Sequence, residues 1–380
     1  MEIYADYAAT TPVKPEVVDA MMTIYNSHYG NPSSIHAKGR DARKYLDESR
    51  RQIAQLLGAD THEIIFTSGA TESNNTAIKG IVKANEQLGN HIITSKIEHH
   101  SVLNVFEQLE REGFDVTYLD VDDTGAIDLD QLEETITDKT ILVSIMFVNN
   151  EVGTVQQIYD IQDIIAETNA YFHVDAVQAI GHLDVKFDEF EIDAMSITAH
   201  KFGGPKGVGA LLVKDHVTLD YPQLGGEQEL KRRAGTENLA QIVGMAKALQ
   251  LAEKNRDDNN IHLMNLKEQF LVKLQERAIP FELNGSMTDA TGHIVNLYFP
   301  FVEVETMLTL LDMAQIYVSS GSACTAGSTQ PSHVLDAMFE DEERSNHSIR
   351  FSFNELTTEN EINAIVAEIH KIYFKFKEES

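Results

Sequence analysis

Short runs of apolar and β-branched residues alternate with amphipathic segments over the first 214 residues, and this alternation limits the fold more than any other feature. The runs have the length of buried strands, and the segments between them carry apolar residues at helical spacing, as at Val102, Val105, Phe106 and Leu109. Strands separated by helices predict an α/β fold whose mostly parallel sheet is covered by helices on both faces. The expected strands are residues 63–68, 91–95, 115–121, 141–148, 171–174, 194–198 and 209–214.

The pattern changes near residue 257, where the strands become fewer and the connections longer. Two charged helical segments are expected at 237–256 and 260–278, followed by a helix at 303–314 and a C-terminal helix. Strands are expected at 293–299, 316–320 and 348–353. We therefore expect a large domain over residues 16–257 and a smaller α+β domain formed by residues 1–15 and 258–380.

Polar residues follow five of the expected strands, at the point where each strand ends. They are Gly69-Ala70-Thr71, Glu98-His99-His100, Asn149-Asn150-Glu151, Asp175-Ala176-Val177-Gln178 and Ala199-His200-Lys201. In open α/β sheets, ligands bind beyond the carboxyl ends of the strands. A single polar group of this kind is explained by the turn that follows the strand, but five groups at the same edge of the sheet predict a pocket.

The net charge of −30 and the sequence pI near 4.7 argue against a broad basic face for nucleic acid. An acidic, solvated surface keeps a protein soluble and leaves room for a basic partner. No apolar run is long enough to cross a membrane, and the N-terminus has no signal-peptide pattern. Cys324 is the only cysteine, so no internal disulfide can form, and we expect a cytoplasmic protein.

Two of the polar groups suit a phosphate and a reactive amine. In TSGATES, Thr71 is a candidate helix N-cap and Gly69 allows close backbone approach, so the helix start suits a phosphate, although a capped helix needs the same residues without any ligand. In AHKFGGPKG, Lys201 directly follows a buried strand, where low-dielectric surroundings free its amine as a nucleophile. Lys206, among Gly and Pro, is the second candidate.

HVDAVQ places a carboxylate and an amide at another strand end. Asp175 can hold a proton on a ring nitrogen, and Gln178 can meet a ring oxygen. A metal site built on His173 and Asp175 is the alternative, but no cysteine-rich or HExxH spacing supports it, and we expect no intrinsic metal. Of the adjacent His99 and His100, at most one is expected to face the pocket.

A Schiff-base lysine, a ring-nitrogen carboxylate and a helix-bound phosphate are the requirements of pyridoxal 5'-phosphate. The chain also resembles the cysteine desulfurases of the NifS/IscS type, within the class V aminotransferase-like enzymes of fold type I. The motifs of this resemblance span nearly the whole chain: YADYAATTP, GNPSSIH, TSGATESNN, EHHSV, VNNEVGT, HVDAVQ, AHKFGGPKG, RRAGTEN, SSGSACTAG and SIRFSF.

The resemblance implies a role for each matching residue. Lys201 binds the cofactor covalently and moves the substrate's α-proton, while Asp175 pairs with the ring nitrogen and His99 stacks on the ring and assists proton transfers. Gln178 and Asn150 contact the ring oxygen, with Asn150 also near the substrate, whose carboxylate Arg350 clamps. The phosphate is held by Ala70, Thr71, Thr198 and His200, and by Thr236 of the second subunit of a homodimer. The family often has Ser where this chain has Thr198, and the hydroxyl is kept.

In this family a cysteine thiolate takes the sulfur of L-cysteine, alanine leaves, and the persulfide passes to a second protein. The resemblance assigns this thiol to Cys324, and the Gly and Ser residues around it predict a loop able both to attack and to deliver. Acceptors such as an iron–sulfur scaffold or a tRNA thiouridylase are implied, and with a scaffold Cys324 is also a candidate transient cluster ligand. Alternatives are a selenocysteine lyase, another class V aminotransferase-like enzyme, or a non-catalytic scaffold or regulator that binds the cofactor.

Overall fold

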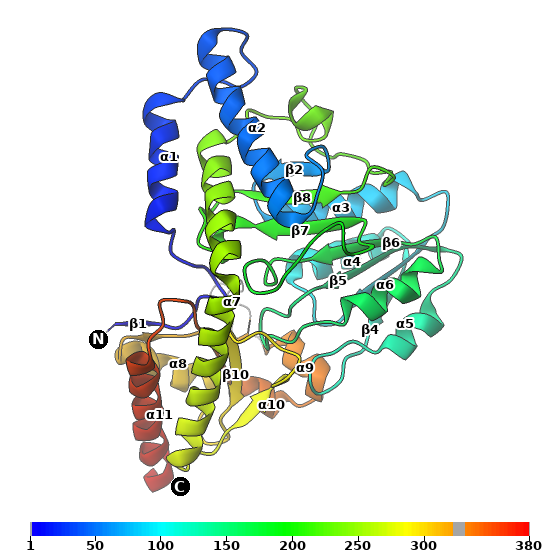
Figure 1. Cartoon of the computed structure of the whole chain (residues 1–380). Helices are drawn as coiled ribbons and strands as arrows, with labels where there is room; N and C mark the ends of the chain where they lie inside the picture. The colour runs from blue at the N-terminus through cyan, green and yellow to red at the C-terminus, as the bar shows by residue number, and fades with distance from the viewer. Residues whose placement is uncertain (1, 322–330, 380) are drawn as a thin grey trace.

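The centre of the molecule is a seven-stranded sheet with the strand order β2-β8-β7-β6-β5-β3-β4 (Figure 1). A computed structural model of the chain describes residues 2–321 and 331–379. Within the sheet β8 is antiparallel to both of its neighbours and the other pairs are parallel, which confirms the expected mostly parallel α/β sheet. The strands are β2 (Ile64–Thr67), β3 (His91–Ser95), β4 (Asp115–Leu119), β5 (Thr140–Met146), β6 (Tyr171–Asp175), β7 (Ala194–Thr198) and β8 (Gly209–Val213).

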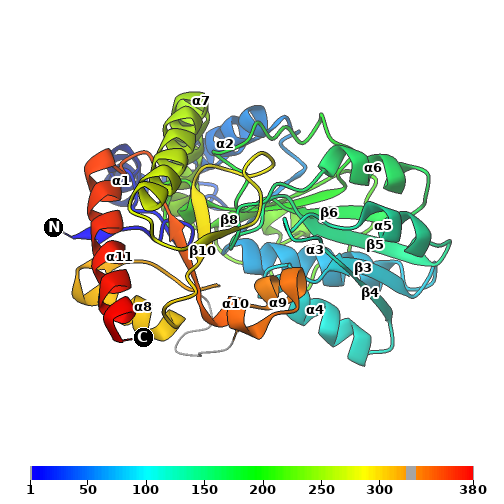
Figure 2. The ribbon, with the colours of Figure 1, turned by 90° about the horizontal axis from the view of Figure 1, so that it is seen from below.

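Helices cover both faces of this sheet (Figure 2). Successive strand residues point to opposite faces, so Ile64 and Leu212 join one apolar cluster while their neighbours Ile65 and Leu211 join another. One face packs against α3 (Ala70–Ala84) and α4 (His100–Arg111). The other face packs against α1 (Pro15–Ser27), α2 (Ala37–Leu57), α6 (Ile158–Ala166) and the first half of α7 (Leu239–Glu276), with the short α5 (Leu129–Thr135) beside α6. Burial on both faces explains why these strands read as continuous apolar runs.

A second apolar core surrounds a small antiparallel sheet in the order β12-β10-β9. Its strands are β9 (Glu282–Asn284), β10 (Ile294–Tyr298) and β12 (Ser348–Ser352), and α8 (Val304–Met313) and α11 (Glu359–Glu379) pack against them. The chain's start joins this core, because β1 (Ile3–Tyr4) pairs in parallel with β11 (Ile316–Tyr317). The short helices α9 (His333–Phe339) and α10 (Glu342–Asn346) precede β12.

The single long helix α7 joins the two cores, whereas the sequence pattern predicted two helices there. Its first half, including Leu249, packs in the large core, and its second half, including Phe270, packs in the small one. No Pro or Gly interrupts residues 257–261, so exposed polar residues at mid-helix dilute the periodicity without ending the helix. We propose the boundary between the two domains at residues 257/258 in this exposed stretch, with residues 1–15 in the small domain. Neither α7 nor any other helix in the described ranges is long and apolar enough to cross a membrane.

The strand directions bring five chain segments to one edge of the large sheet. β8 reverses between β2 and β7, so β2 runs in the same direction as β7, β6, β5 and β3. The carboxyl ends of these five strands therefore meet at the same edge, and each is followed by one of the polar groups singled out above.

Candidate active site

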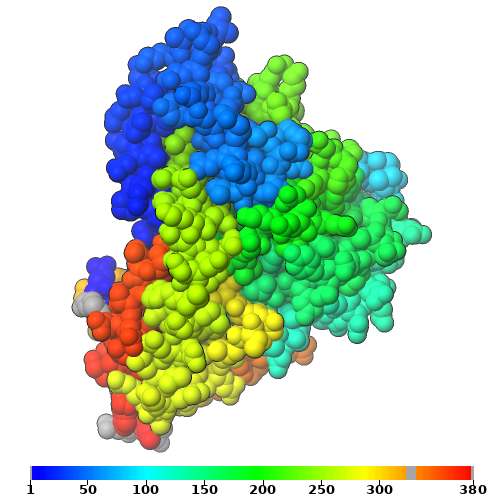
Figure 3. Space-filling view, viewed as in Figure 1, coloured from blue at the N-terminus to red at the C-terminus, as the bar shows by residue number. Residues whose placement is uncertain are grey.

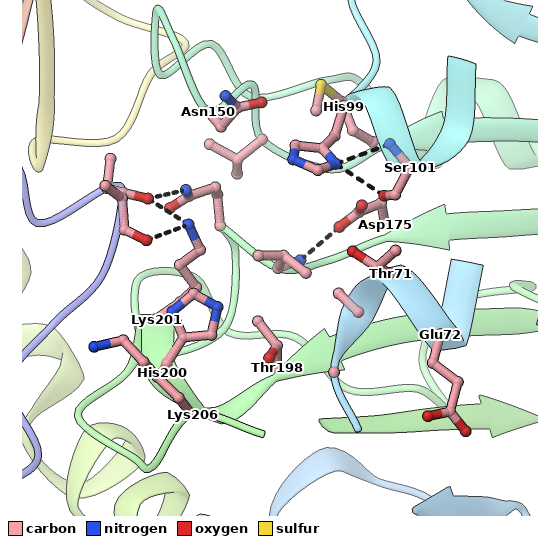
Figure 4. Close-up of a pocket in the computed structure, with 18 of the residues that line it drawn as sticks. Thr71, Glu72, His99, Ser101, Asn150, Asp175, Thr198, His200, Lys201 and Lys206 are labelled. Atoms are coloured by element: carbon pink, nitrogen blue, oxygen red, sulfur yellow. Dashed lines mark hydrogen bonds between the residues drawn. The ribbon is translucent and has the colours of Figure 1, made fainter. Parts of the chain in front are cut away.

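A cavity of about 400 Å³ lies at this edge of the sheet (Figure 4). Predicted site residues from all five strand ends, and one from the small sheet, line it together: Ala70, Thr71, His99, Asn150, Asp175, Gln178, Thr198, His200, Lys201 and Arg350. Thr236 is exposed and is not among the lining residues. Cys324 lies outside the described residues. The cavity thus joins most of the predicted set.

Lys201 ends the short 3₁₀ helix η1 (Ala199–Lys201), which directly follows β7. Its Nζ donates to the backbone oxygens of Ala8 at 2.5 Å and Ala9 at 3.0 Å, so the N-terminal turn of the chain holds the amine at the cavity wall. Lys206 also lines the cavity, from the glycine-rich segment that follows (Figure 4). The positive charges of both lysines, after burial, lower the pKa of His200 to about 4.

Asp175 is the last residue of β6, and its carboxylate is buried in the wall of the cavity. Its Oδ2 accepts from Asn74 Nδ2 at 2.8 Å and its Oδ1 accepts from the Val177 N–H at 3.0 Å. Burial raises the pKa of Asp175, and Asn74, Val177 and the positive charge of Lys201 oppose that rise. The two oxygens keep capacity for a further donor, because an ionised carboxylate has about four acceptor positions.

His173, the other residue of the alternative metal site, is a core residue. Its Nδ1 lies 2.8 Å from Ser144 Oγ and its Nε2 lies 3.0 Å from Ser196 Oγ, so both ring nitrogens are occupied within the sheet. Burial lowers its pKa to about 3 and keeps the ring neutral. Within residues 2–321 and 331–379, no group of three or more His, Cys, Asp or Glu side chains is arranged to hold a metal ion.

Only Ser68 and Gly69 separate helix α3 from β2, and the N-cap of the helix is Gly69 and not the expected Thr71. Gly69 has φ 152°, a conformation that residues with a side chain rarely adopt, so the helix starts earlier than the N-cap preference of Thr71 suggested. The cap has no side-chain hydrogen bond, and the first-turn N–H groups of a helix have no intrahelical acceptor. Glu72 lies in that first turn, where it pairs with Arg233 at 2.8 Å.

His99 is the N-cap of α4, and its Nδ1 accepts the Ser101 N–H at 3.1 Å. A neutral ring that accepts at Nδ1 carries its proton on Nε2. Burial first, then the charges of Lys201, His100 and His333, lower the pKa of His99 to about 4, so the ring is neutral near pH 7. His100 does not line the cavity and its ring packs against His333, in keeping with only one of the adjacent histidines facing the pocket.

Arg350 reaches the cavity from inside β12, and its side chain is only 1% exposed. Its Nη2 donates to Asp6 Oδ1 at 2.9 Å and its Nη1 donates to the backbone oxygen of Asn150 at 2.9 Å. The backbone of Ser319 forms hydrogen bonds with Arg350 in both directions, and the hydroxyl of Ser332 donates to Glu151 at 2.5 Å. The chain on each side of residues 322–330 is therefore attached next to Arg350 and Asn150 at the cavity.

Several partners of the lining residues were not predicted from the sequence. They are Asp6 for Arg350, Asn74 for Asp175, Ser101 for His99, and the carbonyl oxygens of Ala8 and Ala9 for Lys201. Asp6 and Asn74 stand inside motifs that the resemblance uses, YADYAATTP and TSGATESNN, and this membership was the available signal.

The family model, the similar sequences and the similar solved structures all point to the same family. The family model for class-V aminotransferases matches residues 3–365. The putative cysteine desulfurase IscS 1 of Bacillus subtilis is 51% identical over 92% of this chain and 93% of its own length, and the cysteine desulfurase IscS of Dictyoglomus turgidum is 45% identical over 99% and 95%. A solved structure named NifS-like protein superposes with a TM-score of 0.93 at 35% identity, covering 98% of this chain and 99% of the other. The structure of SspA in complex with cysteine gives 0.82 at 36% identity, covering 94% and 100%.

Proposed function

This chain belongs to the class-V aminotransferase family and is a pyridoxal-phosphate-dependent cysteine desulfurase, and from that premise we propose that it converts L-cysteine to L-alanine with a persulfide on Cys324. One observation carries the proposal: the amine of Lys201, the buried carboxylate of Asp175 and the start of α3 line the same cavity. SspA, which is similar over 94% of this chain, has been solved with cysteine bound, and this supports cysteine as the substrate here.

The residues present fit pyridoxal phosphate. Asp175 offers a buried carboxylate to a protonated ring nitrogen, and Lys201 offers an amine to an aldehyde. At the start of α3, a Cβ built on Gly69 would meet nothing nearer than Thr198 Oγ1 at 3.6 Å, so the space beside the first-turn N–H groups is open to a phosphate. Thr71, Thr198 and His200 would add polar groups to that phosphate site.

Each residue of the site would have a separate role in the reaction. Pyridoxal phosphate, when bound, withdraws electrons from the substrate's α-carbon and so weakens the bonds around it. Lys201 would hold the cofactor and later carry the α-proton of the substrate. His99, whose neutral ring carries its proton on Nε2, would stack on the cofactor ring and donate a hydrogen bond from that nitrogen. Gln178 and Asn150 would contact the ring oxygen. Arg350, which Asp6 holds in place, binds the substrate carboxylate through its planar guanidinium.

Cys324 supplies the thiolate that accepts the sulfur. It attacks the sulfur of cysteine, the carbon–sulfur bond breaks with its electron pair left on carbon, and that carbon takes up a proton as alanine forms. The enzyme keeps one sulfur atom as a persulfide, so atoms and electrons balance without an added oxidant. The persulfide then passes to an acceptor protein, for which an iron–sulfur scaffold and a tRNA thiouridylase are the candidates. The single cysteine supports a reducing, cytoplasmic setting.

A homodimer completes the phosphate site in this proposal. Thr236 is exposed and does not line its own cavity, so it is available to a second copy. Large apolar side chains lie uncovered in the same region, including Tyr29 at 70%, Ile35 at 92% and Leu224 at 90% exposed. Figure 3 shows α1 and α2 in blue at the upper end of the molecule. Residues of α2 and of segment 227–237 line one cavity together.

The proposal is tested with purified protein and L-cysteine. The protein should be yellow, borohydride should fix the cofactor on Lys201, and alanine should form in step with persulfide on Cys324. Cys324→Ser should still bind cofactor and substrate but form no persulfide, and undiminished sulfur release by this variant would refute the assignment. Mixing Lys201→Ala with Thr236→Ala protomers tests the dimer, because one site of each mixed dimer regains both residues, and activity should return only on mixing.

A further inference from the structure

His293, beside the small sheet, contacts Gln178, a predicted cofactor-binding residue that follows β6 of the large sheet. It directly precedes β10 and is 2% exposed, and its backbone oxygen accepts the Phe353 N–H at 2.8 Å. Its ring Nε2 lies 3.2 Å from Oε1 of Gln178, which is 4% exposed and lines the active-site cavity. The ring of His293 therefore lies against a residue of the active site.

The orientation of the Gln178 amide follows from its other partner. Its Nε2 donates to the carbonyl oxygen of Ala8 at 3.0 Å, and a carbonyl oxygen can only accept a hydrogen bond. The nitrogen of the amide therefore faces Ala8, and the oxygen faces His293. The same Ala8 oxygen accepts from Lys201 Nζ, so the position of the amide is tied to that of the amine.

The Gln178 orientation in turn fixes the proton on His293. An amide oxygen accepts, so the His293 Nε2 must carry a hydrogen and donate it, which leaves Nδ1 without its proton in a neutral ring. Nδ1 has no hydrogen-bond partner in the described part of the chain. Burial lowers the pKa of His293 well below its usual value, with the positive charges of His182, Lys267, Lys201 and Arg350 adding to that effect, so the ring stays neutral.

The ring of His182 lies stacked on the His293 ring. The two imidazoles are stacked with centroids 3.7 Å apart and 3° between their planes. His182 lines a second cavity of about 570 Å³, which also borders Gln178, Lys201 and His293. His182 packs against the ring but makes no hydrogen bond to Gln178 that the structure records, so it serves as a matched control for His293.

We propose that His293 is a positioning residue for the cofactor, because its Nε2–H holds the Gln178 amide so that the second amide N–H is available to the ring oxygen of pyridoxal phosphate. The inference rests on the proposed function, since it needs a cofactor oxygen beside Gln178. Without the His293 bond only Ala8 holds the amide, which can then turn about its terminal torsion, so the second amide N–H loses its fixed direction. His293 thus acts through Gln178 and contacts neither substrate nor cofactor itself.

The first test follows the visible absorption of the cofactor in the resting holoenzyme as pH is varied. A hydrogen bond to the ring oxygen favours that oxygen without its proton, so its loss should raise the pH midpoint of the absorption change. We expect His293→Leu to raise the midpoint by roughly 0.5–1 pH unit and to speed cofactor loss about three- to tenfold, the effect of one hydrogen bond. His293→Gln places an amide N–H near the Nε2 position and should restore most of the shift, and His182→Leu should leave the midpoint at the wild-type value.

A double-variant cycle shows whether the effect passes through Gln178. In a Gln178→Leu background, His293→Leu should produce no further shift of the midpoint. An equal shift in both backgrounds, no shift in the wild-type background, or the same shift from His182→Leu would each overturn the proposal.

The histidine tautomer gives a second readout, which is measured on the wild-type protein. In wild-type protein labelled with ¹⁵N in its histidine rings, the His293 signal, assigned by its absence from His293→Gln, should show the proton on Nε2. A proton on Nδ1 would overturn the proposal. These results are separate from the proposed function: a wild type without a visible band or alanine formation ends the proposed function, whereas a coloured, active enzyme with the Nδ1 tautomer ends only this inference.

Discussion

The two sides of the active-site cavity treat buried charge in opposite ways. On the large-sheet side, Asp175 lines the cavity and Glu98 directly precedes the lining residue His99; both are buried carboxyl groups whose pKa values are raised by burial. On the small-sheet side, Arg350 is equally buried but is matched by Asp6, in an ion pair of 2.9 Å. An uncompensated buried carboxyl favours binding of a proton or a cation, whereas a compensated arginine stays charged and ready for an anion.

This difference matches the chemistry that each side would perform. The large sheet offers the carboxyl group of Asp175 and the amine of Lys201 to a cofactor whose ring nitrogen carries a proton, and the small sheet offers a guanidinium to the carboxylate of an amino acid. Variants that remove each charge in turn test this difference, beginning with the variant expected to lose most activity.

Lys201→Ala is expected to have the largest effect. The variant removes the amine that holds the cofactor and carries the α-proton, and it also removes the positive charge that opposes the raised pKa of Asp175. Alanine formation from L-cysteine should fall by at least about 10³-fold. The measurement is alanine production, together with the mass of the borohydride-reduced peptide that contains residue 201.

Lys206→Ala is the matched control, because Lys206 lines the same cavity from the same segment. In this variant borohydride should still fix the cofactor, on the peptide containing Lys201. If the cofactor were no longer fixed on the Lys201 peptide of Lys206→Ala, Lys206 and not Lys201 would be the residue that binds the cofactor.

Arg350→Leu tests the small-sheet side. Loss of a charged, two-pronged contact with the substrate carboxylate should lower kcat/KM for L-cysteine by about 100-fold, mostly through KM. Arg350→Lys keeps the charge but loses the planar fork, and should recover about tenfold of that loss. Steady-state kinetics on L-cysteine separates the two terms. An unchanged KM in Arg350→Leu would show that the substrate carboxylate binds elsewhere.

The large-sheet side was predictable from sequence and the small-sheet side was much less so. His99, Asp175 and Lys201 follow strands that read clearly as apolar runs, and parallel strands necessarily bring their carboxyl ends to one edge. Arg350 lies inside a strand of another sheet, where no spacing rule joins it to that edge, and it entered the predicted site only through the resemblance. The helix α7 was predicted as two helices for a related reason, since the apolar periodicity weakens over residues 257–261, which are polar except for the exposed Ile261.

Contacts between distant segments were beyond sequence reasoning altogether. Asp6 meets Arg350 across 344 positions, because the start of the chain lies beside β12 in the small core. His293 meets Gln178 across 115 positions, where the small sheet docks on the large one. Side-chain pairs of this kind depend on how distant segments pack together, and a local pattern carries no information about that packing.

Glu98→Gln tests the uncompensated carboxyl through stability. Burial raises the pKa of Glu98 to about 8 against hydrogen bonds from Ser95 and the Met146 N–H, with the charge of Asp175 adding to the rise. Between an ordinary carboxyl pKa of 4.5 and about 8, the native state keeps a proton that the unfolded state releases, so this group makes stability fall as pH rises. The variant, whose amide oxygen can accept both hydrogen bonds, should remove that decline.

We expect the free energy of unfolding in urea to favour Glu98→Gln over wild type by about 1–3 kcal/mol more at pH 8 than at pH 5. Glu134→Gln, at an exposed position on α5, is the control and should follow the wild type at both pH values. A difference between Glu98→Gln and wild type that does not change with pH would mean that Glu98 is already ionised throughout this range.

Asp6→Asn should have the smallest effect, and it decides whether the compensated arginine depends on its partner. The amide oxygen of Asn can still accept from Arg350 Nη2, but without the charge that orients the guanidinium, so KM for L-cysteine should rise about three- to tenfold while kcat changes less than about twofold. Glu355→Gln is the matched control, because Glu355 forms a comparable ion pair with Lys14 at 2.7 Å and lines the second cavity only, and its KM should equal that of the wild type. If Asp6→Asn instead lowered kcat and left KM unchanged, Asp6 would act on the chemical step. The proposal that Asp6 orients Arg350 for the substrate carboxylate would then be wrong.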